Sequence, residues 1–257
     1  MSQPTRPEGW VDPPRADDLP CCDGEPLESD RHRRQMNLLI DSIEHHWADR
    51  DDFFAGGNMF VYFSSLQAKN NDFRGPDFFV VTDVARGERK SWIVWDEGGR
   101  TPEVIVELLS ESTRDADFGE KKRIYERVLK VPEYFVFDPF SGELWGFRLA
   151  PTTYQEIPRT PGGRLPSTIL GLELGVWSGR YQGIEADWLR MFTATGGVVP
   201  TKAEAATQRA DAAAQRAEAA TQRADAEAQR ADKMAARLAA YETRFGSLDA
   251  SDDESPR

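Results

Sequence analysis

A seven-residue repeat that begins at Thr207 limits how this 257-residue chain can fold. Successive heptads read TQRADAA, AQRAEAA, TQRADAE, AQRADKM and AARLAAY, a composition rich in strong helix formers. An unbroken helix from about Lys202 to Phe245 would be about 65 Å long at 1.5 Å per residue, and it cannot fold back into a compact domain without a break. The sequence therefore predicts a separate C-terminal helix over residues 201–248, with any globular domain before it.

The repeat also predicts how this helix associates. With position a at Ala210, position d holds alanine in the first heptads, and the bulky a and d residues come at the end: Met234, Leu238, Tyr241, Phe245 and Leu248. Arginine occupies position g throughout, so an antiparallel pair would face two arginine rows. We expect a parallel coiled coil that forms a homodimer and is anchored at its bulky end. The alternative is a lone, solvated alanine-rich helix.

Residues 29–200 carry the pattern of an α/β domain. Ser29 or Asp30 caps a first amphipathic helix with apolar residues at helical spacing. Four strand-like segments follow in succession and predict a hairpin-rich sheet: NMFVYFS, PDFFVVTDV, SWIVWDE and EVIVELLS. Residues 115–130 then return to helical periodicity, and EYFVFDP resumes strand character. We expect further strands between residues 141 and 198 and a short helix around Asp187–Phe192 that closes the domain.

The composition indicates the cellular compartment of the chain and the kinds of partner that it can bind. Residues 1–28 hold six of the sixteen prolines, so we expect a disordered leader there, and a disordered acidic tail at residues 249–257. The formal charge of -12 provides no global basic field, so a nucleic-acid partner would be engaged locally. Adjacent Cys21 and Cys22 offer no disulfide framework or zinc site, and no apolar run is long enough to span a membrane. These features predict a cytoplasmic protein without a membrane partner.

Two carboxylates carry the strongest chemical signal. Asp77 follows a proline at the start of one predicted strand, and Glu107 lies inside another among apolar residues. A carboxylate in an apolar strand is costly to bury unless it is paired or bound to a cation. Carboxylates from two neighbouring strands suit Mg²⁺, which binds one or two protein carboxylates, several waters and phosphate oxygens. A lysine of the next helix, Lys121 or Lys122, could orient or deprotonate the attacking water and offset phosphate charge.

Residues 29 to about 195 resemble a restriction-endonuclease-like family that is abundant in some bacterial lineages and is part of the PD-(D/E)xK nuclease superfamily. The resemblance rests on Pro76-Asp77, on VELLSEST with Glu107, and on the run Asp117, Lys121, Tyr125 followed by VPEYFVFDP. It implies an α/β restriction-endonuclease-like fold, a mixed sheet flanked by helices. It also implies Mg²⁺ or Mn²⁺ bound by Asp77 and Glu107, and hydrolysis of DNA phosphodiester bonds by Asp77, Glu107 and Lys121.

One departure from the superfamily pattern leaves two functions open. The superfamily lysine stands two residues after the glutamate, where this chain has Leu109. The resemblance to this branch implies that Lys121 on the following helix replaces it. We therefore expect Lys121→Ala to abolish cleavage with little effect on thermal stability. The alternative function is a catalytically inactive nuclease fold that serves as an interaction module, with assembly through the coiled coil.

Other side chains with catalytic or metal-binding potential are interpreted as structural. His32, His45 and His46 lie on the first helix without a further metal ligand at a suitable spacing, although His32 falls where the family often has a histidine. Ser110, Ser112 and Thr113 form a polar turn that is more typical of helix capping than of nucleophiles. No nucleophile elbow, Walker loop or dinucleotide fingerprint is present in the sequence.

Overall fold

The computed structural model describes residues 13–15, 19, 29–64, 75–110 and 112–246. Contacts divide the chain into Met1–Lys202 and Ala203–Arg257, and each unit is described by itself. Most of the leader expected at residues 1–28, Leu248 and the acidic tail expected at residues 249–257 lie outside the described residues. Within the leader, the backbone carbonyl of Pro14 accepts a hydrogen bond from the Trp95 indole at 3.1 Å, and Leu19 packs beside Phe60 and Tyr62.

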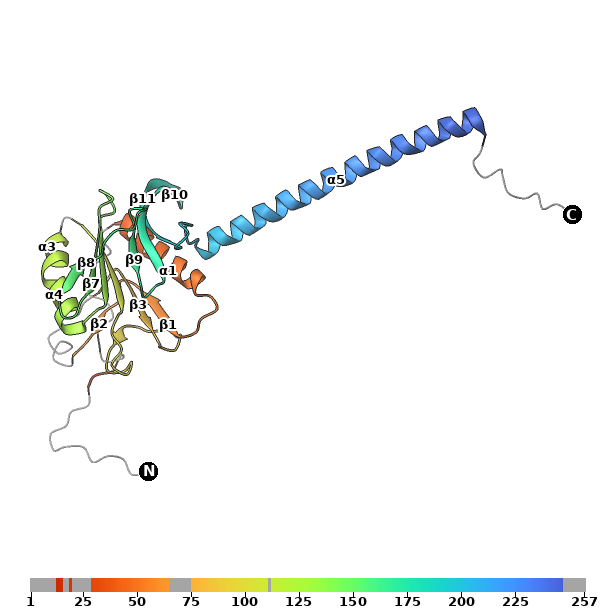
Figure 1. Ribbon diagram of the computed structural model, residues 1–257. Helices are drawn as coiled ribbons and strands as arrows, with labels where there is room; N and C mark the ends of the chain where they lie inside the picture. Colours follow the sequence, from red (N-terminus) through yellow and green to blue (C-terminus); the bar gives the residue numbers. More distant parts are fainter. Residues whose placement is uncertain (1–12, 16–18, 20–28, 65–74, 111, 247–257) are drawn as a thin grey trace, which may run out of the picture. The chain divides into compact units, whose positions relative to one another are not determined.

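The domain is built on a mixed six-stranded sheet (Figure 1). Its strands, in spatial order, are β1 (Phe53–Gly56), β3 (Phe78–Thr82), β5 (Val104–Leu108), β6 (Glu133–Phe137), β7 (Leu144–Leu149) and β8 (Tyr154–Glu156). Strands β5 and β6 are parallel, and the other neighbours are antiparallel. The central strands β5 and β6 are short, largely apolar runs. Every residue of both strands is buried, as expected for strands covered on both faces.

Helix α1 (Asp30–His46) covers one face of this sheet. The Ser29 hydroxyl caps it by accepting a hydrogen bond from the backbone N–H of His32 at 3.3 Å, which confirms the predicted cap. Apolar residues of α1, including Leu39 and Ile43, pack against Phe78 and Val80 of β3. Burial of this apolar stripe fixes the helix against the sheet.

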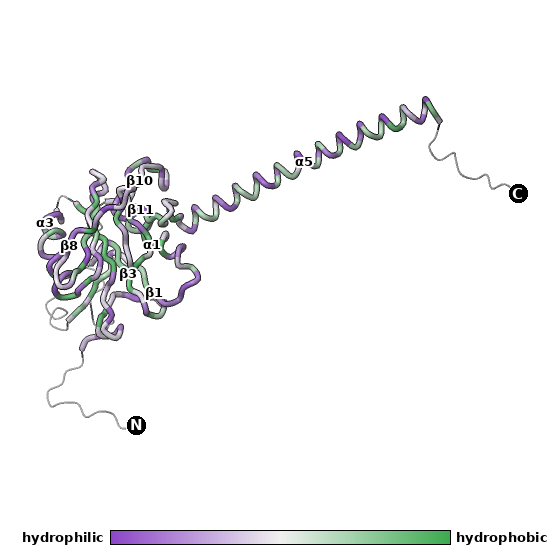
Figure 2. The backbone as a smooth tube through the Cα atoms, viewed as in Figure 1, coloured by the Kyte–Doolittle hydropathy of each residue, from purple (hydrophilic) through white to green (hydrophobic). Residues whose placement is uncertain are grey.

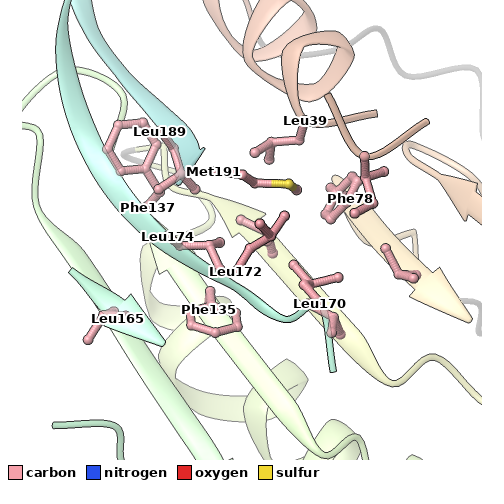
Figure 3. Close-up of a cluster of buried hydrophobic side chains, with 14 of the residues drawn as sticks. Leu39, Phe78, Phe135, Phe137, Leu165, Leu170, Leu172, Leu174, Leu189 and Met191 are labelled. Carbon is pink, nitrogen blue, oxygen red and sulfur yellow. The ribbon is translucent and has the colours of Figure 1, made fainter. Parts of the chain in front are cut away.

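A second, three-stranded sheet packs with α1 against the same face of the six-stranded sheet. It consists of β9 (Leu165–Ser167), β10 (Leu172–Tyr181) and β11 (Ile184–Phe192), with β10 in the middle. Its leucines and Met191 interdigitate with Phe135 and Phe137 of β6 (Figure 3). The inward residues of the two sheets and of α1 therefore share one hydrophobic cluster.

The opposite face of the six-stranded sheet is covered by one helical segment made of four parts (Figure 1). The parts are α3 (Arg114–Ala116), η2 (Asp117–Lys121), α4 (Lys122–Ile124) and η3 (Tyr125–Leu129), of which η2 and η3 are π-helical. Ser110 and Thr113 precede it and each accept the other's backbone N–H on a side-chain hydroxyl. This reciprocal bonding closes the polar turn, although Thr113, the N-cap residue of α3, makes no side-chain cap hydrogen bond to the helix.

Several predicted elements are confirmed and others need correction. The predicted strands at β3, β5 and β6 and the helix over residues 115–130 are present. The helix predicted around Asp187–Phe192 is wrong, because these residues belong to β11 and pair with β10. The first strand of the sheet, β1, was not predicted. Strands β2 (Val61–Tyr62) and β4 (Trp92–Ile93) form a separate parallel pair, so the four early segments do not make one run of hairpins.

Helix α5 (Lys202–Phe245), an unbroken helix of 44 residues, belongs to the second unit in all but its first residue. Along it the hydropathy alternates between hydrophilic and more hydrophobic positions, in contrast to the strongly hydrophobic strands of the domain (Figure 2). Met234, Leu238, Tyr241 and Phe245 are between 50% and 71% exposed. The long C-terminal helix is therefore confirmed. No helix in the described part of the chain is long and apolar enough to cross a membrane.

Candidate active site

Asp77 and Glu107 are brought together by the antiparallel pairing of β3 and β5. Asp77 directly precedes β3, and its Oδ2 accepts a hydrogen bond from the backbone N–H of Leu108 at 2.8 Å. Leu108 follows Glu107 on β5, so the two carboxylates lie at the same end of neighbouring strands. Each carboxylate influences the pKa of the other, as expected for adjacent charges.

Glu107 is fully buried, with 0% of its surface exposed. The Tyr125 hydroxyl donates to its Oε1 at 2.7 Å, and the Lys121 ammonium donates to its Oε2 at 3.2 Å. Both donors come from the helical segment that covers this face of the sheet. A buried carboxylate is tolerated when such charge-assisted hydrogen bonds replace its hydration, which explains how the apolar strand accommodates Glu107.

Asp117 adds a third carboxylate to the cluster. It is 1% exposed, and its Oδ1 forms an ion pair with the Lys121 ammonium at 2.7 Å. A hydrogen bond from the Thr113 side chain also lowers the pKa of Asp117. The Lys121 ammonium therefore links two buried acids, Asp117 and Glu107.

The electrostatics of the cluster favour protonation of its acids. Burial raises the pKa of Glu107 to about 7, and the neighbouring charge of Asp77 adds to this effect while Lys121 opposes it. Burial also raises the pKa values of Asp77 and Asp117 to about 6. Displaced pKa values in buried, mutually coupled carboxylates are typical of functional sites.

Lys121 remains a cation in this environment. Burial alone lowers the pKa of its ammonium, but the charges of Glu107 and Asp117 outweigh burial and raise the pKa above the usual value. Its side chain is 23% exposed, so one lysine reaches both buried acids and still borders solvent. Lys121 is therefore suited to hold negative charge in place rather than to accept a proton at neutral pH.

The donor set fits a hard divalent cation that keeps several waters. The described residues contain no group of three or more His, Cys, Asp or Glu side chains arranged around a common metal position. Mg²⁺ does not require such a group, because it is commonly held by one or two carboxylates together with water and phosphate oxygens. Asp77 and Glu107 supply two oxygen donors from adjacent strands, and the high pKa of each buried acid would fall when a cation binds.

The three residues proposed from sequence lie together: Lys121 contacts Glu107, and Asp77 adjoins Glu107. Asp117 and Tyr125 belong to the family motif, but no role was predicted for either, although each stands four residues from Lys121. Lys122 points elsewhere, with its ammonium 3.3 Å from the centroid of the Phe147 ring. His32 is structural, because its Nε2 bonds the Leu109 carbonyl at 3.1 Å and its Nδ1 bonds the Ser29 hydroxyl at 2.8 Å.

The mixed sheet with helices on both faces, together with carboxylates and a lysine at one strand end, defines a restriction-endonuclease-like domain. The chain belongs to the Uma2 family, whose description reads "Putative restriction endonuclease" and whose model matches residues 13–181. This membership and the fold support a nuclease function.

Solved structures include a similar protein. It is a chain titled "Crystal structure of a putative nuclease belonging to DUF820 from Anabaena variabilis ATCC 29413", which is 14% identical in sequence with a TM-score of 0.43. The similarity covers 62% of the present chain and 91% of that chain. None of the curated proteins matches this sequence.

Proposed function

We propose that this protein is a Mg²⁺-dependent endonuclease that hydrolyses phosphodiester bonds of DNA. The observation that carries the proposal is the contact of 3.2 Å between the Lys121 ammonium and Glu107, beside Asp77 on the neighbouring strand. A lysine next to paired carboxylates is the set of groups that metal-assisted phosphodiester hydrolysis uses. The family match supports the reaction class.

Asp77 and Glu107 would hold the metal, with Mn²⁺ as an acceptable replacement for Mg²⁺. When bound, the ion would activate a water molecule and neutralise charge on the phosphate. Asp77 is oriented by the Leu108 backbone N–H, and Glu107 is oriented by the Tyr125 hydroxyl. Lys121, which stays protonated, would align the water and offset the charge that develops on the phosphate oxygens.

The rival function is an inactive nuclease fold that works as an interaction module. Leu109 at the usual lysine position favoured that interpretation. Leu109 is buried in the same apolar cluster as Tyr125, whereas Lys121 reaches Glu107 from the helix. The lysine required for catalysis is thus available from another element, which favours the enzyme.

Cleavage of supercoiled plasmid and of single-stranded DNA with Mg²⁺ or Mn²⁺ tests the proposal. We expect the parent protein and Lys122→Met to cut and Glu107→Gln to be inactive, each with an unchanged circular dichroism spectrum. Absence of cleavage by the parent protein under all of these conditions would support the interaction module. Equal activity of Glu107→Gln would remove the carboxylate pair from the mechanism.

We also propose that α5 pairs two copies of the chain in parallel. Acidic residues occupy position b of four successive heptads: Asp211, Glu218, Asp225 and Asp232. Position b lies beside e, and a parallel pair brings the g flank of one helix against the e flank of the other. Alanine and threonine at e are short, so the arginines at g can reach the acids at b. An antiparallel pair would instead place like charges together.

Light scattering on full-length charge variants tests this pairing. The triple variant Arg216→Glu, Arg223→Glu, Arg230→Glu should be monomeric at micromolar concentration. Mixing it with the triple variant Glu218→Arg, Asp225→Arg, Asp232→Arg should restore a dimer. A chain that ends at Pro200 serves as the monomer control. If the parent protein is also a monomer at this concentration, α5 is a lone solvated helix.

A further inference from the structure

A cavity of about 480 Å³ lies at the carboxyl ends of the two parallel strands β5 and β6. Four segments of the domain contribute to it: the start of α1, the end of β5, the start of α3 and the turn after β6. Six of its lining residues are Ser29, His32, Ser110, Arg114, Asp138 and Phe140. The volume is within the range of small-ligand sites, and the position is where open α/β sheets bind ligands.

The cavity adjoins the candidate active site along the chain and in space. Its lining residues Leu109 and Ser110 directly follow Glu107 and Leu108, and Leu108 donates its backbone N–H to Asp77. Arg114 lies one helical turn before Asp117. A DNA strand with a phosphate at the carboxylates would therefore place a neighbouring nucleotide at the cavity.

The walls of the cavity offer aromatic surface. The His32 ring is 3% exposed and held on both nitrogens, and its centroid lies 5.9 Å from that of the Phe140 ring. Phe140 itself is 72% exposed, although a phenyl ring gains from burial. An exposed ring beside a cavity provides a stacking surface for a planar ligand, and stacking on aromatic side chains is how proteins hold unpaired bases.

The polar groups favour a base over a second phosphate. The Asp138 carboxylate lies 3.9 Å from the Arg114 guanidinium, and its Oδ1 accepts the backbone N–H groups of Phe140 and Ser141. An acidic group in the cavity would repel a phosphate. Together with Arg114 and the hydroxyl of Ser110, it supplies the donors and acceptors that the edge of a base requires.

We propose that this cavity binds one unstacked base of a DNA strand whose neighbouring phosphate lies at Asp77 and Glu107. The inference rests on the proposed nuclease function, because it takes the substrate of that same site to be DNA. A base inside a duplex cannot enter a pocket without leaving its stack. The cavity therefore selects single-stranded or unpaired DNA over intact duplex.

Binding of a fluorescein-labelled, single-stranded DNA oligonucleotide tests the proposal, measured by fluorescence anisotropy in EDTA so that no cleavage is required. Phe140→Ala should weaken binding by about tenfold or more, the effect expected for the loss of one base–aromatic stack. Val128→Ala is the matched control, because Val128 is also exposed but does not line the cavity, and it should bind like the parent protein. A series of oligonucleotides, each with one abasic nucleotide at a different position, should identify the bound base. At that position, removal of the base should weaken binding to the parent protein but not to Phe140→Ala.

Equal affinities of Phe140→Ala and the parent protein, or no binding by the parent, would overturn the inference. The two proposals fail separately. Binding that depends on Phe140 without any cleavage in Mg²⁺ would keep the base site and reject the nuclease function. Cleavage by a parent protein whose DNA affinity does not change in Phe140→Ala would keep the nuclease function and reject the base site.

Discussion

Replacing Lys121 by methionine removes the only cation that contacts Glu107 and Asp117 in the described residues, with little change in side-chain length. Lys121 pairs with Asp117 at 2.7 Å and with Glu107 at 3.2 Å. Both acids are at most 1% exposed, so neither can gain hydration in compensation. The sequence alone suggested that this lysine could be removed with little loss of stability, and the two ion pairs reverse that expectation.

The magnitude follows from the burial of the two partners. Removal of one member of a buried ion pair costs about 3–5 kcal/mol, because the remaining charge is left without compensation. Lys121 is 23% exposed, so we take the lower end, about 3 kcal/mol. For a domain of this size, that loss lowers Tm by about 6–12 °C.

The loss should depend on pH. The folded-state pKa values of Glu107, about 7, and Asp117, about 6, lie above the ordinary values of 4.5 and 3.8. An acid whose pKa is raised in the folded state contributes to the free energy of unfolding. This contribution is fully present below about pH 4 and is lost as the pH rises through the folded-state pKa. Lys121 lowers the pKa values of both acids, so these values rise further when Lys121 is removed. The free energy of unfolding then continues to fall up to a higher pH. We expect the large drop in Tm near pH 8 and a small one near pH 5, where the acids are protonated.

Thermal unfolding followed by circular dichroism at both pH values, together with the plasmid cleavage assay, provides the measurement. Lys122→Met is the matched control, because Lys122 contacts the Phe147 ring instead of the carboxylates. It should stay within about 1 kcal/mol of the parent protein, the size of one exposed cation–π contact. If Lys121→Met unfolds at the parent temperature at both pH values, the ion pairs do not stabilise the buried acids.

Three further changes probe the same cluster. Asp77→Asn keeps an oxygen acceptor for the Leu108 N–H, so Tm should change little while calorimetry shows Mg²⁺ affinity falling by about tenfold or more; unchanged affinity would exclude Asp77 as a ligand. Tyr125→Phe removes the bond of 2.7 Å to Glu107 and should cost about 1–3 kcal/mol in urea unfolding near pH 8, and a cost near zero would show that the hydroxyl is dispensable. Saturating Mg²⁺, at about 100 Kd, should add about 2.7 kcal/mol near pH 8 and almost none near pH 5, because binding requires ionised carboxylates; equal gains would contradict their raised pKa values.

Much of the fold was predictable where local pattern and tertiary context agree. The β5 and β6 segments are apolar, β-branched or aromatic runs, and they form fully buried strands. Asp187–Phe192 were misread because DWLRMF contains good helix formers, whereas nine residue pairs with β10 make Ile184–Phe192 a strand. The signal that was missed is the two-residue turn at Gln182 and Gly183, with φ of 46° and 85°, as a tight hairpin requires.

The sequence predicted which residues form the candidate site, but it did not predict which of their side chains contact one another. Glu107 stood out because a carboxylate in an apolar strand needs a partner. The identity of that partner depends on how the helix packs on the sheet, since Lys121 and Glu107 are 14 residues apart in the chain. Burial of Asp117 was also hidden, because charged residues surround it in the sequence and its position against the sheet depends on tertiary packing.

The π-helical turns of η2 and η3 set the rotational phase of the helix that carries Asp117, Lys121 and Tyr125. In an unbroken α-helix, Lys121 would lie about 40° and Tyr125 about 80° around the axis from Asp117. The wider π-helical turns oppose this drift, and Lys121 and Tyr125 both reach Glu107 while Lys121 also pairs with Asp117. One residue inserted or deleted here changes phase as well as length. When sequences of this family are aligned, a gap placed in this helix is therefore equivalent to a change in the candidate site.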